Sequence, residues 1–232
     1  MTTILLTGSS RGIGAASFQA LRDAGATVIG HGTASGIAAD FADPAAPAKL
    51  WGAALDQAGG EIDVLVNNAG VFEANTLDSD AADWLAGWER TMQVNLTAAA
   101  QLSRLAVLHW QARGQGGRIV NVASRAAYRG DSPAHWHYAA AKAGMVAMTK
   151  TIARGYAREN ILAFAVCPGF TMTGMAEDYL ASRGGDKLLA DIPLGRVADP
   201  EEVASAVRYL ALEAPASMTG TVIDINGASY VR

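Results

Sequence analysis

Cysteine is nearly absent from the chain, which has only Cys167 among its 232 residues. A single cysteine cannot form a disulfide within the chain, and this scarcity is typical of proteins from a reducing compartment. We interpret Cys167 as a buried strand residue, with a nucleophile as the alternative. Basic runs are also missing, because 18 Lys and Arg are spread among 22 Asp and Glu for a formal net charge of -4. This balance argues against binding to nucleic acid or to an anionic membrane.

Long apolar runs are missing as well. No segment approaches the roughly 18 unbroken apolar residues of a membrane span. The opening MTTILLTGSS lacks the basic start and apolar core of a secretory signal. The chain also has no internal repeat, low-complexity block or linker rich in Pro and Ser. We therefore expect a cytoplasmic protein with no membrane partner, folded as one domain over residues 1–232.

Short apolar runs alternate with longer stretches of helical periodicity. This alternation predicts an α/β fold in which helices cover both faces of a parallel sheet. In such sheets ligands bind beyond the carboxyl ends of the strands. Helices are expected over residues 12–24, 44–58, 82–113, 133–158 and 199–213. Strands are expected at TILLT, TVIG, DVLVNNAG, RIVNVAS, ILAFAVCPG and TVIDING.

The connection between the second and third strands is unusually short. Only HGTAS separates TVIG from the candidate strand GIAAD, whereas a parallel crossover ordinarily needs about ten or more residues. We predict that the helix between these strands is shortened or missing. The third strand is then short, displaced or reached by an extended loop.

The first strand ends in a glycine-rich turn, TGSSRGIG, in which Gly8, Gly12 and Gly14 lead directly into a helix. Glycines permit unusual dihedral angles and let backbone amides approach a phosphate at a helix N-terminus. The turn lacks the Gly-Lys-Ser/Thr of a P-loop and differs in spacing from G-x-G-x-x-G. We interpret it as a nucleotide-binding turn that does not belong to a nucleotide triphosphatase.

Two further strand ends carry small polar residues. NNAG, residues 67–70, offers room for an adenosine against the backbone, although a simple turn fits equally well. NVAS ends the following strand and places Ser124 on the same rim, fourteen residues before Tyr138. Because serine at a strand end is often only a turn former, its position carries more weight than its type.

Tyr138 and Lys142 stand four positions apart in HYAAAKAG. In a helix this spacing puts both side chains on one face, roughly 6 Å apart. At an effective dielectric of about 20, the attraction between a phenolate and an ammonium at that distance is roughly 3 kcal/mol. The pair therefore predicts a phenol whose pKa is lowered toward the range of acid–base catalysis. An unremarkable surface pair is the alternative.

In order along the chain come T-G-x-x-x-G-x-G at 7–14, N-N-A-G, Ser124, the Y-x-x-x-K of Tyr138 and Lys142, and a P-G pair. This series closely resembles the classical branch of the short-chain dehydrogenase/reductase family, in particular the 3-oxoacyl-carrier-protein reductase type, over nearly the whole chain. The resemblance implies a doubly wound Rossmann-type sheet of about seven strands in the order 3-2-1-4-5-6-7. It also implies NAD(P)-dependent hydride transfer between a carbonyl and a secondary alcohol, with reduction favoured.

The resemblance assigns four catalytic roles. Tyr138 would be the general acid in reduction and the general base in oxidation, and Lys142 would lower its pKa and hold the nicotinamide ribose. Ser124 would hydrogen-bond the substrate oxygen as charge develops there. Asn95, in QVNLTAAA, would hold a water that relays protons to the lysine, or is simply a polar helix residue.

The resemblance also implies a cofactor site along the strand ends, where Asp40 would lie near the adenine and Thr171 would bond the carboxamide. No acid follows the second strand at His31, where a carboxylate would repel a 2′-phosphate, and Arg11 lies in the glycine turn. We therefore prefer NADP(H) to NAD(H). The predicted cofactor contacts are Gly8, Ser10, Arg11, Gly12, Ile13, Gly14, Asp40, Asn67, Ala69, Gly70, Tyr138, Lys142, Pro168, Gly169 and Thr171.

Residues 172–192 would form the substrate lid that the family carries here. Met172, Met175 and Tyr179 would contact substrate or simply pack. In SRAAYRGD, Arg125 and Arg129 come within reach of the pocket together with Tyr128. An arginine there would bind an acidic substrate or stand in solvent, and we prefer the second interpretation.

Other aromatic and basic residues invite further interpretations. His135 and His137 alternate as a metal pair would, but two ligands without a third are poor evidence for zinc, so no metal is predicted. Trp84, Trp88 and Trp110 are interpreted as packing or interface anchors.

The smooth surface of the AAAKA helix would permit the homotetramer that family members commonly form, with a dimer as the alternative. A silent NADP-binding regulatory or scaffold protein of the same fold is the alternative function. Dehydration or epimerisation by the same site is a third.

Overall fold

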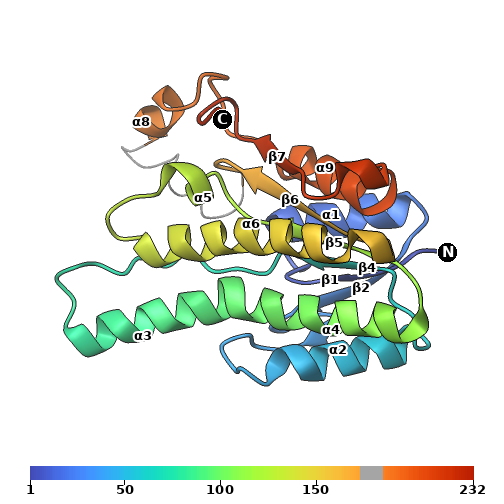
Figure 1. Ribbon diagram of the computed structural model, residues 1–232. Helices are drawn as coiled ribbons and strands as arrows, with labels where there is room; N and C mark the ends of the chain where they lie inside the picture. The colour runs from blue at the N-terminus through green and yellow to red at the C-terminus, as the bar shows by residue number, and fades with distance from the viewer. Residues whose placement is uncertain (173–184) are drawn as a thin grey trace.

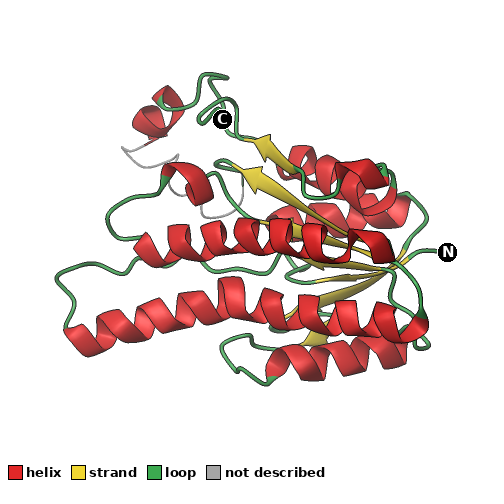
Figure 2. Ribbon diagram, viewed as in Figure 1, coloured by secondary structure: helices red, strands yellow, loops and turns green. Residues whose placement is uncertain are grey.

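The computed structural model describes residues 1–172 and 185–232, and in this part of the chain a single parallel sheet runs through the centre (Figures 1 and 2). The sheet has seven strands in the order β3-β2-β1-β4-β5-β6-β7. This order confirms the doubly wound topology expected from the sequence. The strands are β1 (Thr3–Leu6), β2 (Thr27–Gly32), β3 (Ile37–Ala38), β4 (Val64–Asn67), β5 (Gly117–Val122), β6 (Ile161–Pro168) and β7 (Val222–Ile225).

Helices cover both faces of the sheet, as predicted. Helices α1 and α9 pack on each other along one face, while α2, α4 and α6 cover the other (Figure 1). The strand arrows point toward the end of the molecule where α5 and α8 lie (Figure 2). The helices are α1 (Gly12–Asp23), α2 (Ala46–Gln57), α3 (Ala81–Met92), the π-helix η1 (Gln93–Thr97), α4 (Ala98–Arg113), α5 (Ala126–Arg129), α6 (Trp136–Tyr156), the 3₁₀-helices η2 (Ala157–Glu159) and η3 (Ala216–Met218), α8 (Gly185–Ala190) and α9 (Pro200–Leu212).

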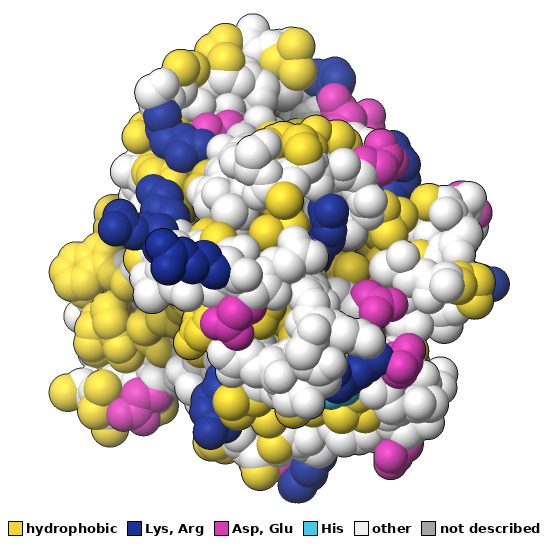
Figure 3. All heavy atoms as spheres, turned by 45° about the vertical axis from the view of Figure 1, so that its right-hand side comes forward, with side chains coloured by type: hydrophobic (Ala, Val, Ile, Leu, Met, Phe, Trp, Pro, Cys, Tyr) yellow, Lys and Arg dark blue, Asp and Glu magenta, His cyan; other side chains and the backbone are white. Residues whose placement is uncertain are grey.

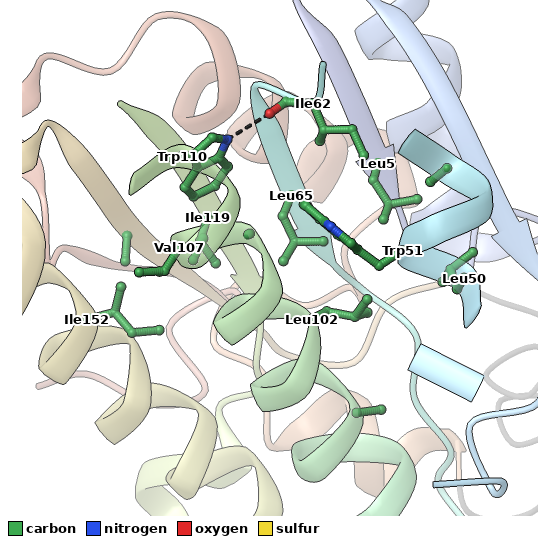
Figure 4. Close-up of a cluster of buried hydrophobic side chains, with 14 of the residues drawn as sticks. Leu5, Leu50, Trp51, Ile62, Leu65, Leu102, Val107, Trp110, Ile119 and Ile152 are labelled. Carbon is green, nitrogen blue, oxygen red and sulfur yellow. Dashed lines mark hydrogen bonds between the residues drawn. The ribbon is translucent and has the colours of Figure 1, made fainter. Parts of the chain in front are cut away.

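Alternation along the strands places the two largest apolar clusters of the described core on opposite faces of the sheet. Ile4 and Leu6 point toward α1 and α9, whereas Leu5 points toward α2 and α4. On the α4 side, the buried indole of Trp110 donates a hydrogen bond of 2.7 Å to the carbonyl of Ile62 (Figure 4). Trp110 is thus a packing residue. The central strands β1, β4 and β6 are buried on both faces, and their sequences are accordingly almost entirely apolar.

The short second connection has the form predicted for it. Residues 33–36 alone join β2 to β3, and no helix lies between them. The third strand has only two residues, with Ile37 beside His31 and Ala38 beside Gly32. Gly36 makes this possible with a φ of 63°, a conformation that side chains rarely adopt.

The helix predicted over 82–113 consists of α3, η1 and α4, which follow one another without a break. Asn95 lies in η1, the π-helical part. The sequence pattern did not indicate the π-helix, nor the short α5 between β5 and α6. Helix α9 begins as predicted, with Pro200 in its first turn and the Asp199 amide donating to Glu202 Oε2 at 2.8 Å.

Acidic and basic side chains are interspersed over most of the face drawn in Figure 3. Among the helices that the structure describes, none is both long and apolar enough to cross a bilayer.

Candidate active site

Ser124, Tyr138 and Lys142 lie in the wall of one cavity of about 450 Å³ beyond the carboxyl ends of β5 and β6. Ser124 lies two residues beyond the end of β5, while Tyr138 and Lys142 lie one turn apart on α6. The ammonium of Lys142 is 5.8 Å from the centre of the Tyr138 ring and donates a hydrogen bond of 2.9 Å to the carbonyl of Val122. The fold therefore brings together the three side chains that the sequence had placed on one rim.

Burial dominates the protonation of the Tyr138–Lys142 pair in the protein without cofactor. It raises the pKa of Tyr138 to about 12, against the opposing effect of a hydrogen bond from Ser124. Burial also lowers the pKa of Lys142 to about 8. The expectation that the ammonium lowers the phenol pKa is thus not met by the protein alone, because the loss of water around each group is the dominant effect. Part of the Tyr138 ring still faces the open cavity.

Asn95 lies behind Lys142 and is fully buried in η1. Its Oδ1 accepts from the amide of Val71 at 2.7 Å, and its Nδ2 donates to the carbonyl of the same residue at 2.8 Å. A Cβ on the intervening Gly70 would lie 3.1 Å from Asn95 Oδ1 and 3.5 Å from Lys142 Nζ. Asn95 therefore fixes the main chain that forms the floor of the cavity next to the lysine.

The glycine turn has the geometry needed to hold a phosphate. A Cβ on Gly14 would lie only 1.8 Å from the carbonyl oxygen of Gly8, so the two segments are in contact. Helix α1 begins at Gly12 with no side-chain cap from Arg11 and no acidic residue in its first turn. The amides and the positive end of the helix dipole thus remain available to an anion. The residues fit the pyrophosphate of a dinucleotide.

His31 fastens the glycine turn to the end of β2, a role that the sequence analysis missed. Its Nδ1 accepts from the amide of Gly8 at 3.2 Å, and its Nε2 lies 3.0 Å from the carbonyl of Ala39. The ring stacks on Phe41 with centroids 4.4 Å apart, and burial lowers its pKa. The signal in the sequence was a histidine at a position where the strand pattern required a buried side chain.

The two asparagines of NNAG have different roles. The amide of Asn67 is buried and donates to Ser103 Oγ and Asn121 Oδ1, so its side chain points into the core and not toward the cofactor. A contact between Asn67 and the cofactor, as predicted from the sequence, would therefore involve its main chain. Asn68 lines the cavity instead, and its Nδ2 donates at 3.0 Å to the carbonyls of Thr7 and Gly8.

The remaining predicted cofactor residues fall into two groups. Ile13, Gly70, Pro168, Gly169 and Thr171 line the same cavity as the catalytic candidates. The others do not line this cavity: Asp40 is exposed, accepts from the amide of Ala42 at 2.9 Å and borders a separate hollow of about 360 Å³. The rest lie in or against the glycine turn and are Gly8, Ser10, Arg11, Gly12, Gly14 and Ala69.

Aromatic side chains form a wall of the cavity that the sequence had not identified. Phe72 stacks on His135 with centroids 3.9 Å apart and meets Tyr138 edge-on at 4.8 Å. His135 is thus a wall residue, and no group of three metal-ligating side chains occurs among the residues that the structure describes. Phe72 and His135 lie in loops, where no periodicity indicates which way a side chain points.

Arg125 departs from its expected exposure. The preferred interpretation was a solvated arginine, but Arg125 is only 8 % exposed and lines the cavity. Arg129 instead lies at the surface and pairs with Asp191 at 2.7 Å. Tyr128 turns away and stacks on Tyr230.

The predicted lid falls mostly outside the described residues, including Met175 and Tyr179. Met172 is described and packs against Ile192 and Val197. Cys167 is fully buried in β6, and burial raises the pKa of its thiol to about 11, which excludes the nucleophile interpretation.

Comparisons with known proteins agree with this geometry. A family model described as enoyl-(acyl carrier protein) reductase matches residues 8–228. The 3-oxoacyl-[acyl-carrier-protein] reductase FabG of Vibrio cholerae is 36 % identical over 98 % of this chain and 96 % of its own length.

Two solved structures have the same fold, each with a TM-score of 0.88 and bound NADP. One is a candidate 2-deoxy-D-gluconate 3-dehydrogenase of Agrobacterium tumefaciens, 27 % identical, with 100 % of this chain and 97 % of the other covered. The second is a candidate NAD(P)-dependent gluconate 5-dehydrogenase of Beutenbergia cavernae, 30 % identical, with 98 % and 96 % covered. This chain therefore belongs to the short-chain dehydrogenase/reductase family, whose NAD(P)-dependent oxidoreductases act on CH–OH and C=O groups.

Proposed function

We propose that this protein reduces a carbonyl to a secondary alcohol with NADPH, using Tyr138 as the general acid. The observation that carries the proposal is the shared cavity of Ser124, Tyr138 and Lys142 above a floor fixed by Asn95. The glycine turn and the cavity residues around Pro168 would hold the dinucleotide. When bound, NADPH would supply the hydride.

The side chains of this chain supply the proton and the electrostatic stabilisation. A phenol with a pKa of about 12 is fully protonated at neutral pH, so Tyr138 is ready to donate to a carbonyl oxygen that gains negative charge. Ser124 Oγ accepts from the amide of Ala126 at 3.1 Å, and its hydroxyl, which hydrogen-bonds Tyr138 in the protein alone, would donate to the same oxygen. Lys142 is mostly charged at pH 7, and its ammonium would stabilise the phenolate that remains. The favoured direction is therefore reduction, and Asn95 would hold the water through which Lys142 recovers protons.

The test of the proposal is turnover. Oxidation of NADPH is followed by its absorbance with a panel of ketones, oxo acids and oxo esters, and formation of NADPH is followed with the matching alcohols. We expect saturable carbonyl reduction. If NADPH binds but no carbonyl or alcohol reacts, the silent regulatory or scaffold protein is favoured. Products that differ by water or by configuration, with no net change in NADPH, would indicate dehydration or epimerisation.

We propose NADP(H) as the cofactor on two observations. Arg11 is exposed on the glycine turn, and no carboxylate follows β2, where Gly32 and Thr33 stand. Replacing Arg11 by Gln removes a charged hydrogen bond to the 2′-phosphate, commonly about 1.5 kcal/mol, and should raise the KM for NADPH roughly tenfold. Steady-state kinetics should show no such rise for NADH. The control is Arg22→Gln on the same helix, and equal changes for both cofactors in R11Q would contradict this prediction.

We further propose a cytoplasmic homotetramer, with a dimer as the alternative. Leu85 and Trp136 are about half exposed beside the stacked pair Trp84 and Trp88, whose centroids lie 5.6 Å apart. Helix α6 presents partly exposed alanines next to this patch. Exposed aromatic clusters of this kind are typical of protein interfaces. Light scattering in solution should give four times the chain mass of 24.0 kDa, and a monomer would contradict the proposal.

A further inference from the structure

Arg125 is a buried guanidinium in the wall of the cavity, adjacent in the chain to Ser124. Its main chain is held on both sides, since its amide donates to the carbonyl of Pro168 at 2.9 Å and its carbonyl accepts from the amide of Tyr128 at 3.1 Å. The side chain therefore starts from a fixed point between β5 and α5. Burying a charge of this kind is costly unless hydrogen bonds compensate it.

The described residues do not supply all the hydrogen bonds that would offset the burial of the Arg125 charge. Its Nη1 is buried and makes no hydrogen bond within the part of the chain that the structure describes. Asp191 Oδ2 lies 3.5 Å from this atom, outside hydrogen-bond geometry. The same oxygen is bound by Arg129 Nη1 at 2.7 Å, and Arg129 Nη2 reaches the other oxygen at 3.5 Å. Asp191 is thus the partner of Arg129 first.

Asp131, the second acid near Arg125, does not hydrogen-bond the guanidinium either. Asp131 lines the cavity, but its Oδ1 accepts from the amide of Ser132 at 2.8 Å and lies 4.0 Å from His135 Nδ1. Arg125 thus has two acids in its surroundings and a hydrogen bond to neither. Two carboxylates at this distance repel a bound dianion more strongly than a monoanion.

Phe170 orients the guanidinium. The Cζ atom of Arg125 lies 4.8 Å from the centre of the Phe170 ring, over its face. Stacking of this kind uses the face of the guanidinium and leaves its N–H donors, which lie in its plane, to other partners. Both residues line the cavity that holds Tyr138. A planar acceptor inside the cavity could accept hydrogen bonds from these N–H donors.

We propose that Arg125 binds the carboxylate of the substrate, and that the substrate is a monoanionic hydroxy or oxo carboxylic acid. The inference rests on the proposed function for the reacting end of the molecule, because Ser124 and Tyr138 would hold the carbonyl oxygen. A carboxylate accepts the guanidinium fork in a bidentate manner. The anion would supply the hydrogen bonds that Asp191 and Asp131 do not.

The experiment compares each acid with a neutral partner of the same skeleton, using purified full-length protein. The pairs are 3-oxobutanoate with methyl 3-oxobutanoate, assayed with NADPH, and D-gluconate with sorbitol, assayed with NADP. In at least one pair, we expect the acid to exceed the neutral compound in kcat/KM by about 30-fold, about 2 kcal/mol. In Arg125→Gln this ratio should fall to about one, mainly through KM, and Arg125→Lys should restore part of it. If Arg125→Gln acted only by removing the contact with Asp191, kcat/KM would fall equally for the acid and for its neutral partner.

Arg158→Gln is the matched control, because it removes the same charge at an exposed position in η2. It should keep the wild-type ratio. The inference is overturned if the wild-type protein uses neutral compounds as well as acids, or if a phosphate monoester is preferred to the carboxylate of the same skeleton.

Calorimetric titration of the NADP-saturated protein with 3-hydroxybutanoate, D-gluconate and their neutral partners separates this inference from the proposed function. Binding of an acid that is lost in Arg125→Gln, in a protein without turnover, would support the anion site and refute the reductase. Reduction of neutral carbonyls without binding of any acid would support the reductase and refute the anion site.

Discussion

Replacing Tyr138 by Phe is expected to lower kcat for carbonyl reduction by about 10³, in the range that general acid catalysis contributes. The ring keeps its edge-on contact with Phe72, whose centroid is 4.8 Å away, so the cavity keeps its shape. What is lost is the proton that Tyr138 holds at a pKa of about 12. The dissociation constant of NADPH should rise by no more than about threefold, less than 1 kcal/mol, since the glycine turn binds the distant phosphates.

Stopped-flow measurement of hydride transfer and fluorescence titration of NADPH test the two parts of this prediction separately. Tyr209→Phe is the control, because it makes the same chemical change on α9, where the phenol contacts the sulfur of Met218. Retention of more than about a tenth of the wild-type rate in Y138F would refute the role given to Tyr138 in general acid catalysis. Loss of NADPH binding together with the rate would instead indicate that the hydroxyl holds the cofactor.

Replacing Lys142 by Met should abolish measurable turnover and yet stabilise the fold at pH 7. Burial lowers the pKa of Lys142 from its ordinary 10.5 to about 8, which corresponds to roughly 3 kcal/mol spent on keeping a buried ammonium charged. Methionine keeps the apolar stem and removes the charge, but the hydrogen bond to the carbonyl of Val122 is lost. We expect a net gain of about 1 to 2 kcal/mol in the free energy of unfolding.

The gain should depend on pH in a defined direction. Between pH 8 and pH 10.5 the folded protein has released the Lys142 proton while the unfolded chain still holds it, so the wild-type protein becomes more stable as pH rises. The advantage of K142M should therefore shrink from pH 7 to pH 9.5, measured by urea unfolding. Lys150→Met, an exposed position two turns along α6, should change stability by less than about 0.5 kcal/mol at either pH. A destabilised K142M at pH 7 would contradict this reasoning.

The fold could be predicted from the sequence because its signals are repeated and local. The central strands are short apolar runs, since both their faces are buried, as at Ile4 and Leu5 of β1. The missing helix after β2 followed from chain length alone. The π-helix around Asn95 could not be predicted in this way, because the stretch QVNLTAAAQ is too rich in small residues to show where the apolar periodicity shifts by one position.

The candidate site was predictable only where a motif fixes both residue type and position. Tyr138 and Lys142 share a helix face, so their spacing determined their proximity. Their protonation was not predictable, because it depends on burial by residues far apart in the chain. The motif also did not show that the Asn67 side chain points into the core while Asn68 lines the cavity, because this depends on the packing of Asn67 against Ser103 and Asn121, far away in the chain. Arg125 was misjudged because a loop has no periodicity from which burial can be inferred.

The π-helix η1 has a consequence for how precisely the site can be built. Each α-helical residue advances the direction of the side chain by about 100°, so one inserted residue turns everything after it to a new face. Gln93–Thr97 thus allows Asn95 to reach the main chain of Val71 under the cavity while α4 still turns Leu102 and Trp110 toward the sheet. Asn95 is held by a helix whose later turns are packed in the apolar core. Its position therefore does not require the ordering of a flexible loop, which would cost conformational entropy.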